Sequence, residues 1–222
     1  MKIITLAVAL LVAAGSLTVN ATTVNTSFGS LPSATWGGSG IPNGAVSITT
    51  ISGLPNSDTI TLGLTATPRY SAGELANNGA GTFYASPGIS SPGLANWNFD
   101  YYIGISGGEF ANYHFVLSYG NNSLTYSFDP VAIANADGGK SVTATTREDS
   151  ENLGWFLPFN PNANGTYNYD LKAYDSDLNL LGDSLMTVQV GQPVSDGGST
   201  AGMLGIGAIG MVFVKRKFGL AA

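Results

Sequence analysis

The fold is decided by a stretch in which every second residue is large and apolar: Trp97-Asn98-Phe99-Asp100-Tyr101-Tyr102-Ile103-Gly104-Ile105. Successive side chains of a β-strand point to opposite faces, so a spacing of two predicts a strand with one buried face. The same alternation recurs in runs on both sides of it, namely Ile60–Leu64, Phe115–Tyr119, Leu124–Phe128, Tyr167–Ala173 and Met186–Val190, with a weaker run at Val46–Ile51. We therefore expect the chain to consist mainly of β-strands.

Residues typical of turns separate these runs. Gly120-Asn121-Asn122 lies between two of them and predicts a hairpin connection. Asp175–Asn179 and Gly182-Asp183 fill the gap before the last run. No segment shows a sustained helical period with capping residues. Seven to nine short antiparallel strands are expected, and they predict an all-β fold: an antiparallel β-sandwich of the Ig-like or jelly-roll-like kind, with a barrel as the alternative.

The stretch from Pro68 to Ala95 does not fit this pattern, because glycine and proline recur along it. It predicts a long connection with one short strand at Thr82–Tyr84. Long connections in compact domains are often functional. We therefore expect this stretch to offer a variable binding surface.

Composition excludes several classes of site. The chain has no cysteine, which excludes disulfides, thiolate metal sites and cysteine nucleophiles. Between residues 22 and 199 there are four basic residues and fourteen acidic ones, a net charge of −10. Because such a body repels phosphate backbones, we expect no nucleic-acid partner.

The N-terminus has the three parts of a secretory signal peptide. Met1-Lys2 supplies a basic start, and Ile3–Ala14 is an uninterrupted apolar run. A polar stretch and a small-x-small site follow it, so we predict a signal peptide over residues 1–21, cleaved between Ala21 and Thr22. A buried N-terminal helix is the alternative.

The C-terminus has the features of a membrane anchor. Residues 197–214 are 18 positions without a charge, which as a helix is about 27 Å long, close to the hydrocarbon thickness of about 30 Å. The cations Lys215, Arg216 and Lys217 follow and favour the cytoplasmic side. We predict an exported body over 22–193, a transmembrane helix over 201–214 and a basic tail over 215–222. A glycine-rich core segment is the alternative.

A short motif precedes that helix and reads Val194-Ser195-Asp196-Gly197-Gly198-Ser199-Thr200. The order of motif, glycine-rich apolar helix and basic cluster resembles the PEP-CTERM class of bacterial sorting signals, in its VPDSG-type variant, with Ser195 where that variant has proline. The resemblance covers residues 194–222. It implies an exosortase as processing partner and membrane anchoring before processing, followed by transfer to the cell surface or extracellular matrix. Proteins of this class often accompany exopolysaccharide and biofilm production.

Catalytic candidates are few. His114 is the only histidine and alternates with the apolar residues of its run, so we expect it to face solvent. No Gly-x-Ser-x-Gly motif accompanies it. Glu148, Asp149 and Glu151 could act as acid and base in glycoside cleavage, but we expect such a cluster to be a solvated loop. The sequence therefore predicts no catalytic residue and no enzyme.

Calcium is considered for one turn. Its oxygen-bearing candidates are Asp175, Asp177, Asn179 and Asp183. Leu180 stands where the EF-hand pattern needs glycine, and the twelfth-position glutamate is missing. We expect an ordinary turn there, and no cofactor.

Aromatic residues decide between the remaining functions, because exposed rings can stack on sugars. Trp97 and Trp155 fall within apolar patterns and are expected in the core, whereas Trp36, followed by Gly37-Gly38-Ser39-Gly40, is the candidate for exposure. The sequence predicts an exported, non-catalytic surface or matrix protein associated with exopolysaccharide. A carbohydrate-binding or adhesive module, calcium-dependent or not, is the first alternative, and a polysaccharide hydrolase is the second.

Overall fold

A computed structural model describes residues 22–121, 124–136 and 142–192. The predicted signal peptide (1–21) and sorting signal (194–222) lie outside the described residues. Among the described residues, no helix is both long enough and apolar enough to cross a bilayer.

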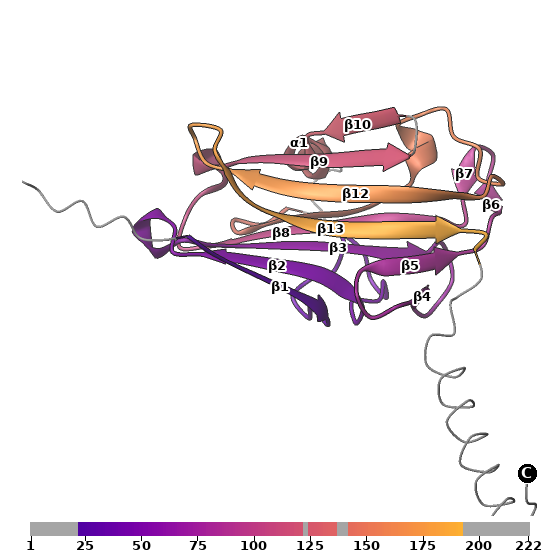
Figure 1. The fold of residues 1–222 in the computed structure, drawn as a ribbon, viewed down its shortest axis with the longest axis horizontal. Coiled ribbons are helices and arrows are strands. Elements are labelled where there is room, and N and C mark those ends of the chain that lie inside the picture. Colours follow the sequence, from indigo (N-terminus) through magenta and orange to yellow (C-terminus); the bar gives the residue numbers. More distant parts are fainter. Residues whose placement is uncertain (1–21, 122–123, 137–141, 193–222) are drawn as a thin grey trace, which may run out of the picture.

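Two large sheets carry the fold (Figure 1). The first sheet is antiparallel, in the order β1 (Thr23–Gly29), β2 (Val46–Ser52), β3 (Thr59–Pro68), β8 (Trp97–Ser106) and β11 (Thr146–Glu151). The second has the order β10 (Leu124–Phe128), β9 (His114–Asn121), β12 (Gly165–Tyr174), β13 (Leu180–Val190), β5 (Thr82–Ala85) and β4 (Ala76–Asn77). The described strands thus form an all-β fold in two separate sheets, which contradicts the barrel alternative.

One strand pair departs from the expected antiparallel pattern. β5 pairs with β13 in parallel, so the second sheet is mixed. β5 confirms the short strand predicted within the long connection, and β4 pairs with it. The same connection also holds a small ribbon of β6 (Ile89–Ser91) and β7 (Leu94–Ala95). The connection is therefore more structured than the sequence predicts.

The core lies between the sheets and is built by the predicted alternation. The apolar positions of β8 are all buried, namely Trp97, Phe99, Tyr101, Ile103 and Ile105. The Phe99 ring stacks on Tyr169 of the second sheet with 4.9 Å between ring centroids, and Trp97 contacts Tyr167 at 5.6 Å. These contacts join the inner faces of the two sheets.

The predicted hairpin is confirmed, since β9 and β10 pair with Asn121 opposite Leu124. The helix that follows, α1 (Pro130–Ala136), was not predicted. Asp129 starts it, because its Oδ1 accepts from the backbone N–H groups of Val131 and Ala132, both at 3.0 Å. Asp followed by proline is a common helix start, and it was the available sequence signal.

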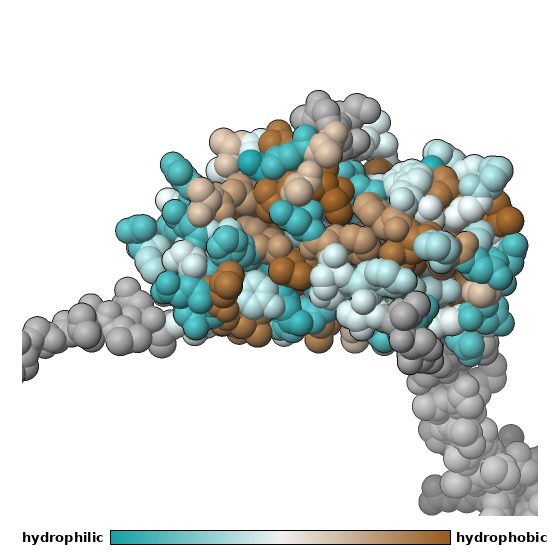
Figure 2. Space-filling view, turned by 90° about the horizontal axis from the view of Figure 1, so that it is seen from above, coloured by the Kyte–Doolittle hydropathy of each residue, from teal (hydrophilic) through white to brown (hydrophobic). Residues whose placement is uncertain are grey.

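α1 packs against β9 and β11 and covers one side of the sandwich. The Tyr101 hydroxyl donates to the Pro130 carbonyl at 2.8 Å, which fixes the helix to the core. Seen from the β10 side of Figure 1, the molecule is apolar along its middle and hydrophilic around it (Figure 2). Phe128, Val131 and Ile133 are partly buried and pack against the core.

The outer faces of the two sheets differ. The second sheet presents polar pairs to solvent, such as Lys172 with Asp170 at 2.7 Å and Thr187 with Asn168 at 3.0 Å. The first sheet carries a second apolar cluster formed with the connection between β1 and β2, whose buried members are Leu31, Ala34, Trp36, Val46 and Tyr102. Part of its outer face is therefore sealed by the chain itself.

Candidate functional site

The outer face of the first sheet is built from residues that alternate with the core. The register of β3, β8 and β11 brings Thr65, Asp100 and Ser150 into one row and sets Asn98 opposite Thr67 in the next. Since their neighbours in the chain point into the core, these side chains point outward. This face divides into a sealed half around Trp36 and an open half around Trp155.

In the sealed half, Glu148 fastens the connection between β1 and β2 to the sheet. Its carboxylate accepts from the backbone N–H groups of Thr35 and Trp36 at 2.8 and 2.9 Å, and from the Thr35 hydroxyl at 2.6 Å. The Trp36 indole N–H donates to the Pro42 carbonyl at 3.0 Å, and the side chain is 1 % exposed. The prediction that Trp36 is exposed was therefore wrong, because its Gly/Ser-rich segment folds back onto the sheet.

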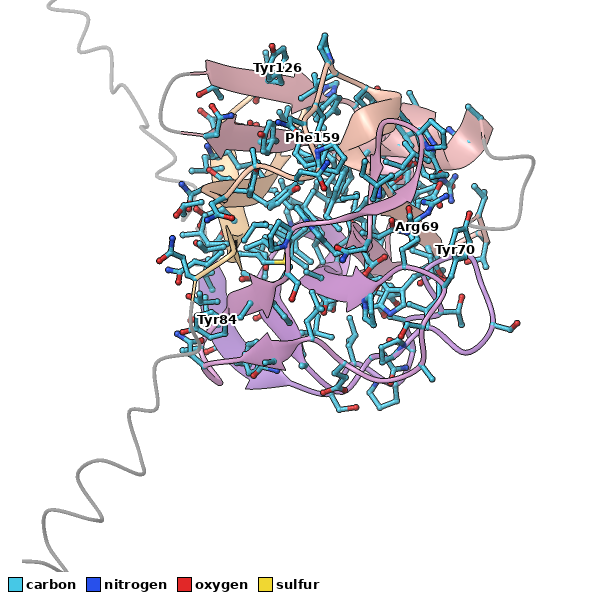
Figure 3. All side chains as sticks on the ribbon, turned by 90° about the vertical axis from the view of Figure 1, so that its right-hand side faces the viewer. Arg69, Tyr70, Tyr84, Tyr126 and Phe159 are labelled. Atoms are coloured by element: carbon cyan, nitrogen blue, oxygen red, sulfur yellow. The ribbon has the colours of Figure 1, made fainter. Side chains whose placement is uncertain are left out.

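The open half centres on a guanidinium between two aromatic rings. The Arg69 Cζ atom lies 4.5 Å from the Tyr70 ring centroid and 4.8 Å from that of Trp155. Tyr70 is 83 % exposed and Trp155 is 51 % exposed. Figure 3 shows Arg69 and Tyr70 next to each other at the periphery of the molecule. We call these three residues the platform.

The prediction that Trp155 belongs to the core was wrong. The residue lies in a 3₁₀ turn, Leu153–Trp155, in which Leu153 is buried and Trp155 is turned outward. Gly154 lies so close to the Gly93 carbonyl that a Cβ atom would not fit. The turn is therefore pressed against the β6–β7 ribbon, which leaves the indole outside. Trp97, also expected in the core, is buried as predicted.

A network of amides holds the platform in place. Arg69 donates from Nη1 to the Asn98 Oδ1 at 3.3 Å and from Nη2 to the Tyr70 hydroxyl at 2.7 Å. The same Asn98 oxygen accepts from Asn152 Nδ2 at 3.0 Å, and Asn98 Nδ2 donates to the Ser150 hydroxyl at 2.9 Å. Arg69 is therefore positioned by strand residues as well as by its two aromatic neighbours.

Asn152 also fixes the turn that carries Trp155. Its side chain is fully buried and donates to the carbonyl oxygen of Trp97 at 2.9 Å, while its Oδ1 accepts from the Gly154 N–H at 3.2 Å. One buried amide thus joins β8 to the turn. A buried side chain with satisfied hydrogen bonds is rigid, so the platform is preorganised.

A hollow of about 670 Å³ lies beside the platform. Its lining includes Asn98, Ser150 and the segment 39–42 along with the three platform residues, and it includes no acidic side chain. Aromatic faces, a cation, an amide and hydroxyl groups are the groups with which proteins bind polyhydroxylated ligands.

Asp100 lies in the row next to this hollow and is fully buried. Neither of its carboxyl oxygens has a hydrogen bond of good geometry. Burial raises the pKa of Asp100 to about 7; the hydroxyls of Ser150 and Thr67 oppose that rise, and the charge of Asp149 adds to it. A substantial fraction of the chains therefore carries a neutral Asp100 at neutral pH.

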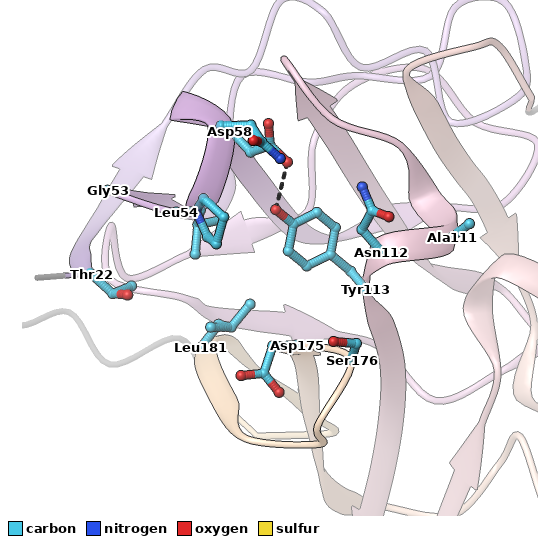
Figure 4. A pocket seen from close by; sticks show the side chains of 12 residues that line it. Thr22, Gly53, Leu54, Asp58, Ala111, Asn112, Tyr113, Asp175, Ser176 and Leu181 are labelled. Atoms are coloured by element: carbon cyan, nitrogen blue, oxygen red, sulfur yellow. Dashed lines mark hydrogen bonds between the residues drawn. The ribbon is translucent and has the colours of Figure 1, made fainter. Parts of the chain in front are cut away.

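A second hollow, of about 700 Å³, lies beside the 3₁₀ turn Pro55–Ser57 (Figure 4). The Tyr113 hydroxyl donates to Asp58 Oδ2 at 2.7 Å, and both side chains are buried. Burial, followed by the bond to Asp58, raises the pKa of Tyr113. The lining includes Asp58 and Asp175 but no basic side chain. With no exposed aromatic ring, it is less suited to stacking on a sugar.

The acidic cluster is not the solvated loop that was expected. Glu148, Asp149 and Glu151 all belong to β11, and each is less than a tenth exposed. The alternation of the strand directs Glu148 to the outer face and the other two to the opposite face. Because Glu148 is bonded to Thr35 and Trp36, it does not share a site with them.

The calcium candidates lie in and after the turn between β12 and β13. The Asn179 side-chain amide donates to Asp175 Oδ2 at 3.0 Å, and the backbone N–H groups of Asp177 and Asn179 donate to Oδ1 at 2.9 and 2.8 Å. These bonds, the side-chain bond first, lower the pKa of Asp175. The carboxylate is thus occupied in closing the turn, while Asp183 lies in β13 opposite Lys172. Within the described ranges, no three His, Cys, Asp or Glu side chains gather as a metal site would require.

The prediction that His114 faces solvent is confirmed. The platform was missed, although two signals were present. Arg69 and Tyr70 lie in the long connection expected to bind, and Arg69 is one of only four basic residues between positions 22 and 199. No protein-family model matches the chain, and no curated protein is significantly similar to it.

Proposed function

We propose that the chain is an exported cell-surface or extracellular-matrix protein whose β-sandwich binds polysaccharide through the platform without cleaving it. The observation that carries the proposal is the pair of exposed rings, Tyr70 and Trp155, both in contact with Arg69 beside a polar hollow. Exposed apolar groups that gather in one place often mark a binding site, and aromatic faces match the apolar C–H faces of sugars. The Ig-like or jelly-roll-like subclass of the sandwich belongs to the same proposal.

A binding role is favoured over a hydrolytic one. Cleavage of a glycosidic bond needs two carboxyl groups facing one substrate, about 5–10 Å apart. No acidic side chain lines the hollow beside the platform. Glu148, the acid on the same face, is held by the backbone of Thr35 and Trp36. The proposed function therefore needs no catalytic residue and no cofactor.

The proposed location rests on the terminal sequences. The apolar N-terminal run and the motif, apolar segment and cations after residue 193 support export, membrane anchoring through the C-terminal helix and processing by an exosortase-type enzyme. Intact-mass analysis of the surface form tests this. We expect a chain that begins at Thr22 and lacks everything after about Thr200, and a full-length mature chain would contradict it.

The binding proposal is tested with the full-length protein on a glycan array and by affinity electrophoresis in gels containing polysaccharide. We expect Trp155→Ala and Tyr70→Ala to lose most of the retardation shown by the wild type. Leu185→Ala is the matched control, because Leu185 is 60 % exposed on β13 in the other sheet. Unchanged binding by both platform variants would refute the proposal. Loss of binding with a chelator would add calcium to it.

A further inference from the structure

We infer that the platform takes an anionic polysaccharide, one whose sugars carry carboxylate groups, and that Arg69 pairs with the carboxylate. The inference rests on the proposed function and names its ligand class. Among the described residues, Arg69 has no acidic partner, and no acidic side chain lines the hollow beside it.

The bonds of Arg69 all go to neutral groups. Its Nη1 and Nη2 atoms donate to an amide oxygen of Asn98 and to the hydroxyl of Tyr70, and its Nε is buried without a partner. Among the residues that the structure describes, the ion pair found is the one between Lys172 and Asp170. A guanidinium has five N–H donors, so one on each terminal nitrogen stays free for a ligand.

The surroundings make this cation selective for an anion. The body carries a net charge of −10 between residues 22 and 199, so most of its surface repels an acidic polymer. The hollow beside Arg69 is an exception, since its lining contains this one charged residue. Neutral sugars would gain little from an unpaired cation, whereas a carboxylate can accept both free N–H groups in a forked pair.

The Arg69 side chain is also held in place before a ligand binds, so binding loses little side-chain entropy. The guanidinium lies against the rings of Tyr70 and Trp155, and Asn98 accepts a hydrogen bond from its Nη1. Tyr70 has a φ of 58°, a left-handed backbone that bulky residues rarely adopt. Such strain persists where the surrounding structure demands it and is frequent in ligand sites. Here it sets the phenol over the cation.

The test compares two polymers that differ at the carboxyl group, which is ionised in one and esterified in the other: polygalacturonate and its fully methyl-esterified form. Affinity electrophoresis of the full-length protein at 50 mM NaCl should give a dissociation constant for polygalacturonate at least about tenfold smaller than that for the ester. Arg69→Met, which keeps an unbranched apolar stem but removes the charge, should remove that preference. Arg69→Lys should retain part of it, because it keeps the charge but loses the fork.

Controls separate this inference from the proposed function. Lys172→Met removes a cation from the outer face of the second sheet and should leave both affinities unchanged, and thermal unfolding checks that each variant is folded. If both polymers bind equally and Arg69→Met has no effect, while Trp155→Ala loses both, the ligand class is wrong and the binding function stands. If neither polymer is retarded, the ligand class is wrong, and absence of binding on the glycan array as well would overturn the proposed function.

Discussion

Two tryptophans beside the same sheet face have opposite environments. Trp36 is 1 % exposed and Trp155 is 51 % exposed. The indole N–H of Trp36 is satisfied by Pro42, and its backbone is bonded to Glu148. Trp155 instead lies against Arg69 at the edge of a hollow. A large apolar ring is therefore buried where the chain covers the sheet and is left accessible where the chain stops covering it.

The charged residues of the two halves differ in the same way. Glu148 is buried and accepts three hydrogen bonds from residues of its own chain. Arg69 is half-buried, and its hydrogen bonds go to neutral groups. A charge satisfied internally stabilises the fold, whereas a charge without a counter-ion is available to a ligand. The sealed half should therefore control stability, and the open half should control binding.

The largest expected effect is that of Trp36→Ala. Removing this buried ring leaves a cavity between the sheet and the connection that covers it, and should lower the free energy of unfolding by about 4 kcal/mol. Trp155→Ala should lower it by less than about 1 kcal/mol, because the ring is half exposed. Urea denaturation of both variants measures the difference. Equal losses would mean that the two halves are not distinct.

A smaller loss is expected for Glu148→Gln. The amide keeps the shape but loses the charge, which weakens the bonds from Thr35 and Trp36. We expect a loss of about 2 kcal/mol in the free energy of unfolding. Glu109→Gln, a change at an exposed glutamate, is the control and should have almost no effect. A neutral result at Glu148 would show that the connection is held by its apolar contacts alone.

Much of the fold could be predicted from the sequence, because alternation is a local signal. The apolar positions of β3, β8, β9, β12 and β13 are buried as the pattern requires. β1 was missed because Thr23–Gly29 is mostly polar and exposed at the edge of its sheet. The parallel pairing of β5 with β13 joins residues about a hundred positions apart, and no local pattern reports it.

The site was predicted less well, because a tertiary contact decides whether a polar or aromatic residue is covered. Glu148 gives no sign in the sequence of its bonds to Thr35 and Trp36, which lie more than a hundred positions away. Similarly, Trp155 stands among the apolar residues Leu153, Phe156 and Leu157, yet Gly154 packs against Gly93 and the ring is turned outward. Composition shows how few cations the chain has, but not that Arg69 would lie beside a hollow without an acidic side chain.

A third prediction concerns the pH dependence of stability and the buried carboxyl group of Asp100, which lies in the row next to the hollow. Burial raises the pKa of Asp100 from 3.8 to about 7, so between these values the folded chain holds a proton that the unfolded chain has released. Stability should therefore fall as pH rises from about 4 to about 7, and level off above that. Asp100→Asn should abolish this dependence, so the variant should gain stability relative to the wild type as pH rises from 5 to 8. Urea midpoints at pH 5 and pH 8 measure it, and an unchanged slope in the variant would rule out Asp100 as the cause.

The smallest expected effect concerns the backbone of Tyr70, which like Trp36 has a positive φ, at 58° and 55° respectively. Tyr70→Ala and Tyr70→Gly both remove the ring over Arg69, so both should lose polysaccharide binding. Only glycine adopts this backbone without strain, so Tyr70→Gly should be more stable than Tyr70→Ala by about 1 kcal/mol. The difference between their urea midpoints isolates the backbone, because the lost ring contact is common to both. Alanine at least as stable as glycine would mean that the open half stores no strain, and that Tyr70 is held over Arg69 by the ring contact alone.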